Sequence, residues 1–232
     1  MIFLIGAKGK IGLNIAAEFS RLNISFTCVT RSGGGNAWSF ERLLDEIIDF
    51  EQAIIINAAT LAFNNLKILL GKIRPKTKII HVSSVSVYGN STPPNIVNPI
   101  NSYGEKKLLE EQEIMNHDNY VLIRLANIYG GSPETSGALS LYHTSSLEFV
   151  ETDLHGDELI RDYVSIEKFL TCVINSLSMR SSCIINVSSG IGLTLSEFCT
   201  KQRIDISHLP KVICGDDTIL KSVVSPTYLK YL

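Results

Sequence analysis

The sequence predicts an α/β protein built on a doubly wound parallel sheet, with helices over both faces. Apolar runs without polar alternation recur along the first half of the chain, at residues 2–5, 24–30, 54–57, 78–84 and 120–130. Segments of helical character alternate with these runs, at residues 11–22, 39–50, 61–73 and 102–116. Continuous apolar strands that alternate with helices are typical of parallel sheets buried on both faces.

A different pattern begins near residue 131. Gly, Ser, Pro and Thr crowd residues 130–137, and beyond them one more helix, at 164–179, and one more strand, CIINVSS at 183–189, stand out. We therefore predict two units. An α/β domain comprises residues 1–130 and about 160–187, and a small C-terminal lobe comprises about 131–159 and 188–232.

Composition and charge argue against several classes of protein. The formal net charge is −2, and the basic residues are spread along the chain, whereas nucleic-acid and membrane surfaces cluster them. The five cysteines form no CxxC pair, and the five histidines show no metal-ligand spacing. No apolar stretch approaches a membrane span, and no basic segment precedes the first apolar run. We expect a cytoplasmic protein without a metal site, a nucleic-acid partner or a membrane contact.

Three glycines follow the first strand with the spacing G-x-x-G-x-x-G, at Gly6, Gly9 and Gly12. A dinucleotide-binding turn needs glycines there, because the chain turns sharply and the backbone must approach a pyrophosphate closely. The N–H groups at the start of the following helix then bind the phosphates. We predict such a loop, and a plain tight turn is the alternative. The predicted loop also includes Lys8, Lys10 and Ile11.

The end of the second strand bears on the choice between NAD and NADP. An acidic residue there would bind the ribose 2′-hydroxyl of NAD. The chain instead has Thr30, Arg31 and Ser32, without a carboxylate nearby. Arg31 and Ser32 suit a 2′-phosphate, so we expect NADP in preference to NAD. The alternative is that Arg31 is an ordinary solvated surface charge.

Tyr103 and Lys107 are four residues apart in a predicted helix, so their side chains share one face. An ammonium beside a phenol favours the phenolate, and we therefore expect Lys107 to lower the pKa of Tyr103. This makes Tyr103 a candidate acid or base. Ser84, at the end of a predicted strand, is positioned to orient a substrate oxygen. A YxxxK spacing by itself also arises by chance at helix surfaces.

Six motifs together resemble one known family, in the order in which that family carries them. They are NAA (57–59), VSSVSVYG (82–89), YGEKKLLEE (103–111), RLANIYG (124–130), RDYV (161–164) and INVSSG (185–190). The chain resembles a short member of the extended short-chain dehydrogenases/reductases, which include the NAD-dependent epimerase/dehydratase group. The resemblance implies a Rossmann-like fold with a small C-terminal substrate lobe.

The resemblance also implies roles for particular residues. Ser84, Tyr103 and Lys107 match the catalytic positions, and Lys107 also matches a ligand of the cofactor ribose. Further implied contacts are Asn57, Ala58 and Ala59 to the cofactor, and Ser84, Ser86, Tyr103, Asn127 and Arg161 to a nucleotide-linked sugar. Two of these have structural alternatives. Asn127 is also suited to capping a strand end, and Arg161 to pairing with Asp157 or Asp162.

The residues at positions 85 and 86 limit which reactions of the family we expect. Dehydratases of this family place an Asp–Glu pair after the residue equivalent to Ser84, whereas this chain has Val85 and Ser86. Without that acid and base we do not expect dehydration. Reduction of a keto group on a nucleotide-linked sugar is the first hypothesis, because Arg31 favours NADPH. Epimerisation of a nucleotide sugar is the alternative.

Shortened segments leave a third hypothesis open. Only 22 residues separate Arg31 from Ile54, so the expected third strand must be very short, near Ala37 and Trp38. A chain with such reductions can also be an NAD(P)-binding or sensing protein with reduced activity. By the resemblance, helices 61–73 and 102–116 form a four-helix bundle between two copies. We therefore expect a homodimer, with apolar contacts from Leu66, Leu69, Leu70, Leu108, Leu109 and Met115.

Overall fold

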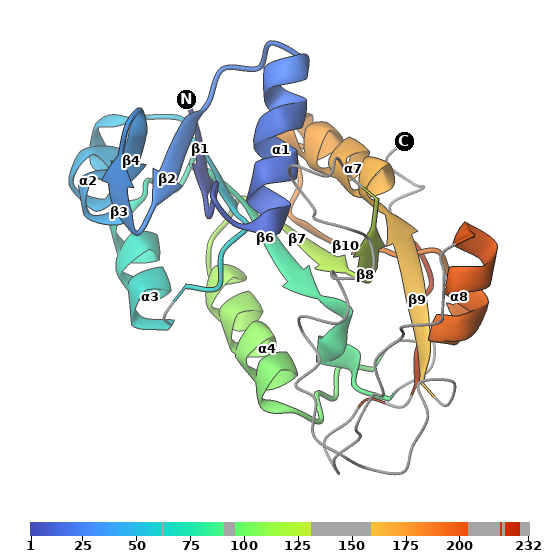
Figure 1. The fold of residues 1–232 in the computed structure, drawn as a ribbon. Coiled ribbons are helices and arrows are strands. Elements are labelled where there is room, and N and C mark those ends of the chain that lie inside the picture. Colours follow the sequence, from blue (N-terminus) through green and yellow to red (C-terminus); the bar gives the residue numbers. More distant parts are fainter. Residues whose placement is uncertain (62, 91–95, 131–158, 204–218, 220, 228–232) are drawn as a thin grey trace.

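A computed structural model of the chain describes residues 1–61, 63–90, 96–130, 159–203, 219 and 221–227 (Figure 1). Its main sheet has eight strands in the order β10-β7-β6-β5-β1-β2-β4-β3. All neighbours are parallel except β3 and β4. The strands are β1 (Ile2–Ile5), β2 (Thr27–Thr30), β3 (Ser32–Gly34), β4 (Ala37–Ser39), β5 (Ile54–Asn57), β6 (Lys78–Ser84), β7 (Tyr120–Leu125) and β10 (Cys183–Val187). The predicted doubly wound α/β fold is confirmed.

Helices cover both faces of this sheet. Helices α1 (Lys10–Arg21) and α7 (Ile166–Ser178) pack on one face, and α2 (Phe40–Glu46), α3 (Phe63–Lys72) and α4 (Ser102–Ile114) pack on the other. A 3-10 turn, η1 (Ile47–Asp49), extends α2. Another, η2 (Val85–Tyr88), follows β6 directly. The helices predicted at 11–22, 39–50, 61–73 and 102–116 are thus present, with ends shifted by a few residues.

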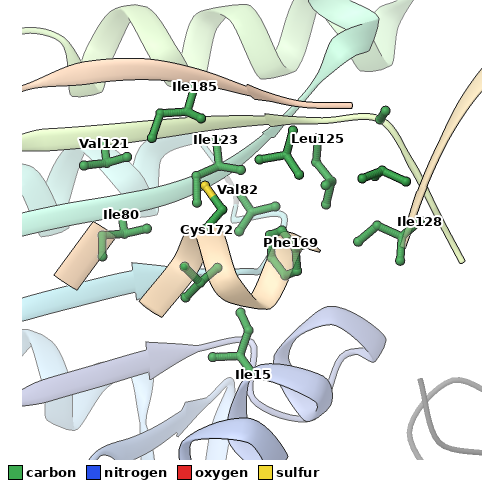
Figure 2. Packing of buried hydrophobic residues seen from close by; sticks show 14 of the residues in the cluster. Ile15, Ile80, Val82, Val121, Ile123, Leu125, Ile128, Phe169, Cys172 and Ile185 are labelled. Carbon is green, nitrogen blue, oxygen red and sulfur yellow. The ribbon is translucent and has the colours of Figure 1, made fainter. Parts of the chain in front are cut away.

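The core is divided between the two faces because successive strand residues point to opposite sides. On the α1 and α7 side, Figure 2 shows Ile80 and Ile123 of the sheet packing toward Phe169 and Ile15 of the helices. On the other side Ile79 packs with residues of α2, α3 and α4. Every residue of β6 is buried. The alternation therefore directs His81, like Ile79, toward the side that α4 covers.

A second, smaller sheet lies beyond the carboxyl end of β7. Its strands are β8 (Asn127–Tyr129), β9 (Ile160–Ser165), β11 (Gly192–Leu193) and β12 (Lys221–Ser222). Helix α8 (Leu195–Gln202) contacts β9 and β11. The helix predicted at 164–179 begins two residues later than expected, because β9 runs to Ser165.

The prediction of one strand over residues 120–130 was wrong. The chain leaves the main sheet at Ala126, whose N–H donates to the carbonyl oxygen of Val187, and then pairs with β9. The sequence shows no break because both strands are buried. Ile128 of β8 is 4% exposed and belongs to the same core as Leu125 of β7. The run of apolar residues therefore continues from β7 into β8, although the two strands belong to different sheets.

A short third strand was expected near Ala37 and Trp38, and β4 confirms it by pairing with β2 in parallel. The antiparallel strand β3 before it was not expected. Three consecutive glycines make this hairpin possible, since Gly33, Gly34 and Gly35 have positive φ angles of +73°, +109° and +58°. The predicted division into two units stays a prediction, because most of the lobe, including residues 131–158, lies outside the described residues.

Candidate functional site

The glycine loop joins β1 to α1 and has the shape of a phosphate-binding turn. Gly6 has a φ of +84°, and a Cβ atom there would lie 2.9 Å from the Cβ of Ala59. A Cβ at Gly12 would overlap the carbonyl oxygen of Gly6. At Gly9, α1 begins without a capping side chain. Glycine is therefore required for this turn, and the start of α1 presents backbone N–H groups suited to an anion.

The NAA segment lies directly beside this loop. Asn57 pairs in register with Ile5, and the N–H of Ala58 donates to the Ile5 carbonyl oxygen at 3.0 Å. The N–H of Ala59 donates to Asn57 Oδ1 at 3.1 Å. The structure thus brings together two predicted cofactor-binding segments that are fifty residues apart in the chain. The remaining loop positions differ in exposure: Lys8 and Lys10 are exposed, and Ile11 is half-buried.

Arg31 and Ser32 are exposed at the carboxyl end of β2, on the same edge of the sheet as the glycine loop. They lie within a tight turn, closed by a hydrogen bond of 3.1 Å from the Gly33 N–H to the Thr30 hydroxyl. Residues 30–36 contain no carboxylate. The position where an NAD ribose would meet an acidic side chain is therefore occupied by a cation and a hydroxyl.

Ser84 ends β6 and caps η2. Its Oγ accepts a hydrogen bond from the backbone N–H of Ser86 at 3.1 Å and donates to the Ser86 hydroxyl at 3.0 Å. This pairing fixes the Ser84 rotamer at the end of a central strand. In open α/β sheets, ligands bind outside the carboxyl ends of the strands, where Ser84 lies.

Helix α4 brings Tyr103 to this position. Asn101 caps the helix by accepting a hydrogen bond from the Gly104 N–H at 2.8 Å. A Cβ at Gly104 would lie 2.6 Å from the carbonyl oxygen of Ser86, so only glycine allows α4 to approach η2 this closely. Tyr103 consequently lies beside Ser84, with 48% of the residue exposed.

The pKa of Tyr103 lies above its ordinary value. Burial of the hydroxyl end raises this pKa, the hydrogen bond with Ser84 opposes the rise, and the negative charge of Glu110 adds to it. The expectation that Lys107 lowers the Tyr103 pKa is therefore wrong for this arrangement. The largest cause of the raised pKa is burial, and the Lys107 ammonium is held by the Glu110 carboxylate.

Lys107 is only 4% exposed. Its Nζ donates to Glu110 Oε2 at 2.9 Å and to the carbonyl oxygen of Val82 at 3.3 Å. Tyr103 and Lys107 share one side of α4, as the spacing predicted, but the ammonium lies deep between α4 and β6. Lys107 therefore lies in the protein interior next to the site and not on its surface.

A second buried network fixes α4 to the sheet. Arg124 on β7 donates to Glu111 from Nε at 3.0 Å and from Nη2 at 2.6 Å. Its Nη1 donates to the Tyr88 hydroxyl at 2.7 Å, and that hydroxyl donates to Asn186 at 2.8 Å. These residues come from four of the recognised motifs, and in this structure they hold the elements around the site in place.

The two predicted substrate residues lie in the second sheet. Asn127 begins β8, half-buried and in register with Tyr163. Arg161, also half-buried, lies on β9, and its Nη1 donates to the Ile160 carbonyl oxygen at 3.1 Å. Asp162 binds the turn at Ser189 and Gly190, accepting from their N–H groups. Asp157, the other partner considered for Arg161, lies outside the described residues.

Sequence reasoning missed two residues of the site, His81 and Glu110. Both are fully buried, and Glu110 Oε2 lies 3.3 Å from His81 Nε2. A histidine within the apolar strand KIIHVSS and a doubled Glu after Lys107 were the available signals. Within the described part of the chain, no group of three His, Cys, Asp or Glu residues is placed to hold a metal ion. Nor is any described helix long and apolar enough to cross a membrane.

Comparison with known families and structures agrees with this geometry. Residues 52–187, more than half of the chain, match the sequence profile of the NAD dependent epimerase/dehydratase family. The chain belongs to this family. It is therefore an enzyme of a family that works with NAD. Among curated protein sequences, none is a significant match.

Solved structures of family enzymes share the fold at low sequence identity. A UDP-glucose 4-epimerase from Thermotoga maritima, with UDP-glucose, is 19% identical with a TM-score of 0.73, over 99% of this chain and 91% of that chain. The Bordetella bronchiseptica enzyme WbmG, with NAD and UDP, is 17% identical with a TM-score of 0.71, over 99% and 86%. A dTDP-glucose 4,6-dehydratase from Bacillus anthracis, with NAD, is 17% identical with a TM-score of 0.70, over 99% and 88%.

The residues present fit the family's cofactor. The glycine loop forms a cradle that a Cβ at Gly6 or Gly12 would fill, and the NAA segment borders it. Tyr103 and Lys107 stand at the carboxyl end of β6, on the same edge of the sheet. The glycine loop, the NAA segment and the Ser84–Tyr103–Lys107 group thus lie along one edge of the sheet.

Proposed function

We propose that this enzyme reduces a keto group of a nucleotide-linked sugar, with NADPH as the hydride source. The observation that carries the proposal is the convergence of Ser84, Tyr103 and Lys107 at the sheet edge that also holds the glycine loop. Ser84 and Tyr103 reach one another although eighteen residues separate them in the sequence. A protein that only bound a nucleotide would not need this arrangement, which argues against the sensing hypothesis.

Each residue has a distinct task in the proposed reaction. The bound nicotinamide would supply hydride to the carbonyl carbon. Ser84 would hold the carbonyl oxygen by a hydrogen bond, and Tyr103 would donate its phenolic proton to the same oxygen. Lys107 would bind the cofactor ribose. The half-exposed ring of Tyr103 can meet a substrate, whereas buried Lys107 cannot.

Residues on β8 and β9 would bind the rest of the substrate. Arg161 suits the diphosphate, because a guanidinium binds phosphate oxygens in a bidentate manner. Asn127 and Ser86 would contact the sugar. The structures described above that contain UDP or UDP-glucose support a nucleotide-linked substrate. Val85 and Ser86, which stand where dehydratases carry Asp and Glu, argue against elimination of water.

The preference for NADP rests on Arg31. It is exposed at the end of β2 beside Ser32, and no carboxylate in residues 30–36 would repel a 2′-phosphate. NAD-bound neighbours have the same fold, so NAD is the competing cofactor.

Epimerisation is the second candidate, favoured by the likeness to a UDP-glucose 4-epimerase. Its oxidation and re-reduction of the sugar would use the same three residues. Purified protein should be incubated with NADPH or NADH and a panel of nucleotide-linked keto-sugars and sugars. Consumption of NADPH in a one-to-one ratio with product supports reduction. A changed sugar configuration without net consumption of NADPH supports epimerisation, and no turnover with any of them contradicts both.

We also propose a homodimer, formed through α3 and α4. The structure changes which side chains would form the contact, because Leu66 and Leu69 lie in the core at 1% and 2% exposure. The exposed apolar side chains of these helices and their ends are Ile68, Leu109 and Met115, at 47%, 50% and 37%. A cytoplasmic location stays a prediction from cysteine usage.

A further inference from the structure

Four buried polar side chains form a continuous line beneath the proposed site. Asn57, His81, Glu110 and Lys107 are 1%, 0%, 0% and 4% exposed, and they come from β5, β6 and α4. Asn57 Nδ2 lies 3.1 Å from His81 Nδ1, His81 Nε2 lies 3.3 Å from Glu110 Oε2, and Lys107 Nζ lies 2.9 Å from the same Oε2. One end of this line is the NAA segment beside the glycine loop, and the other is Lys107.

Hydrogen bonding fixes which nitrogen of His81 carries the proton. The N–H of Ala59 donates to Asn57, so the Asn57 atom that accepts it must be the oxygen. The Asn57 NH₂ group therefore faces His81 Nδ1 and donates to it. Nδ1 must then be unprotonated, which makes His81 neutral and places its proton on Nε2, toward Glu110. Burial lowers the pKa of His81, in agreement with a neutral ring.

Glu110 is the anion of this group. Burial by itself would raise the pKa of Glu110, but contact with His81 and the Lys107 ammonium outweigh it and hold that pKa below its usual value. A negative Glu110 and a positive Lys107 leave the buried pair with no net charge. Neither Glu110 Oε1 nor His81 Nε2 has a partner that meets hydrogen-bond geometry within the described part of the chain, so the 3.3 Å approach of His81 Nε2 to Glu110 Oε2 is a close polar contact.

We propose that Glu110, held in place by His81 and Asn57, is a positioning residue that fixes the Lys107 ammonium and limits its electrostatic effect on Tyr103. The proposal rests on the proposed role of Tyr103 in proton transfer. Tyr103, Lys107 and Glu110 follow one another at spacings of four and three residues, so they line one side of α4. Because Glu110 compensates Lys107, the Tyr103 phenol keeps its proton, which suits a donor to a carbonyl oxygen in reduction.

The other charges around Glu110 do not alter this balance. From α4 these are Lys107 and Glu111, from β6 His81, and from β7 Arg124. Glu111 and Arg124 form their own bidentate pair and compensate one another. The charge that distinguishes Tyr103 from an ordinary Tyr–Lys pair is therefore that of Glu110.

The direct test is an ultraviolet titration of the Tyr103 phenolate, isolated as the difference between each protein and its own Tyr103→Phe version. In Glu110→Gln the midpoint should fall by about one pH unit, because the Lys107 ammonium, one helical turn from Tyr103, then lacks its compensating negative charge. Glu113→Gln is the matched control: it removes the same charge from a half-buried position of α4 that pairs with Lys67. An unchanged or raised midpoint in folded Glu110→Gln overturns the proposal. Glu110→Asp should restore much of the parent value.

A second measurement needs no variant at Glu110. Nitrogen NMR of histidine-labelled parent protein should show His81 neutral and protonated on Nε2 at neutral pH. A cationic ring, or a proton on Nδ1, would overturn the assignment on which the proposal depends. Neither measurement uses a substrate, so a failure to turn over nucleotide sugars and a failure of the Glu110 proposal are distinguishable.

Discussion

Tyr103 and Lys107 are one helical turn apart, yet their surroundings differ sharply. Tyr103 is 48% exposed and Lys107 is 4% exposed. The four-residue spacing was sufficient to predict a shared face, but it carried no information about depth. Depth follows from Gly104, which lets the start of α4 rest on η2 and directs the next turn of the helix into the interface with β6. Tyr103 can therefore meet a substrate while Lys107 acts from the interior.

The residue that should decide cofactor choice is Arg31. We expect the parent protein to bind NADPH more tightly than NADH, and Arg31→Ala to narrow the difference, because a guanidinium gives phosphate charge-assisted hydrogen bonds. Calorimetric titration of both cofactors measures this. Arg21→Ala, an exposed arginine at the far end of α1, is the control and should leave the ratio unchanged. Equal affinities in the parent protein would remove the NADP preference.

At the scale of elements, the central strands of the main sheet could be predicted from the sequence. The β3 hairpin and the break between β7 and β8 could not. Central strands such as β5 and β6 are continuous apolar runs, and a parallel sheet covered on both faces requires such runs. Apolar character did not reveal the break at Ala126, since β8 is buried against the same core. The β3 hairpin depends on the backbone freedom of Gly33–Gly35. A prediction based on apolar runs does not detect such a strand, because it contains no apolar side chain.

The buried ion pair between Arg124 of β7 and Glu111 of α4 gives a stability prediction. Arg124→Ala should lower the free energy of unfolding by about 3–5 kcal/mol, because it leaves Glu111 buried without its cation. Arg42→Ala is a matched control, since Arg42 also pairs with a carboxylate and lies over an aromatic ring, but in an exposed place. It should cost about 1 kcal/mol or less. Urea denaturation measures both, and equal losses would show that the Arg124 network does not hold α4.

At the scale of the whole molecule, the sequence predicted the edge that carries the site, because glycine loop, NAA, Ser84 and Tyr103 all follow or face strand ends. It did not predict the buried line from Asn57 to Lys107. A single histidine in an apolar strand and a second Glu in a helix have no meaning until β5, β6 and α4 bring them together. Pairings of this kind depend on tertiary contacts between segments far apart in the chain.

Assembly offers a further prediction at this scale. Leu109→Glu should give a monomer, because it places a charge at an exposed apolar position of α4 in the proposed contact. Light scattering at micromolar concentration measures the mass of the parent and the variant. Leu22→Glu changes an exposed apolar residue at the end of α1, on the opposite face of the sheet, and it should remain a dimer. A monomeric parent protein would contradict the expectation.

The proposed reduction of a nucleotide-linked keto-sugar depends on proton donation by Tyr103. Its most direct test is the turnover of Tyr103→Phe on a substrate that the parent protein reduces, with cofactor affinity measured alongside. Turnover should fall by about 10²-fold or more with folding and cofactor binding intact, since the substitution removes only the hydroxyl and keeps the ring. Lys107→Ala should impair both turnover and cofactor affinity, and Ser84→Ala should cost less than either. Near-parental turnover in Tyr103→Phe would contradict this role of Tyr103. It would show that the chain shares the fold of the family but not its mechanism.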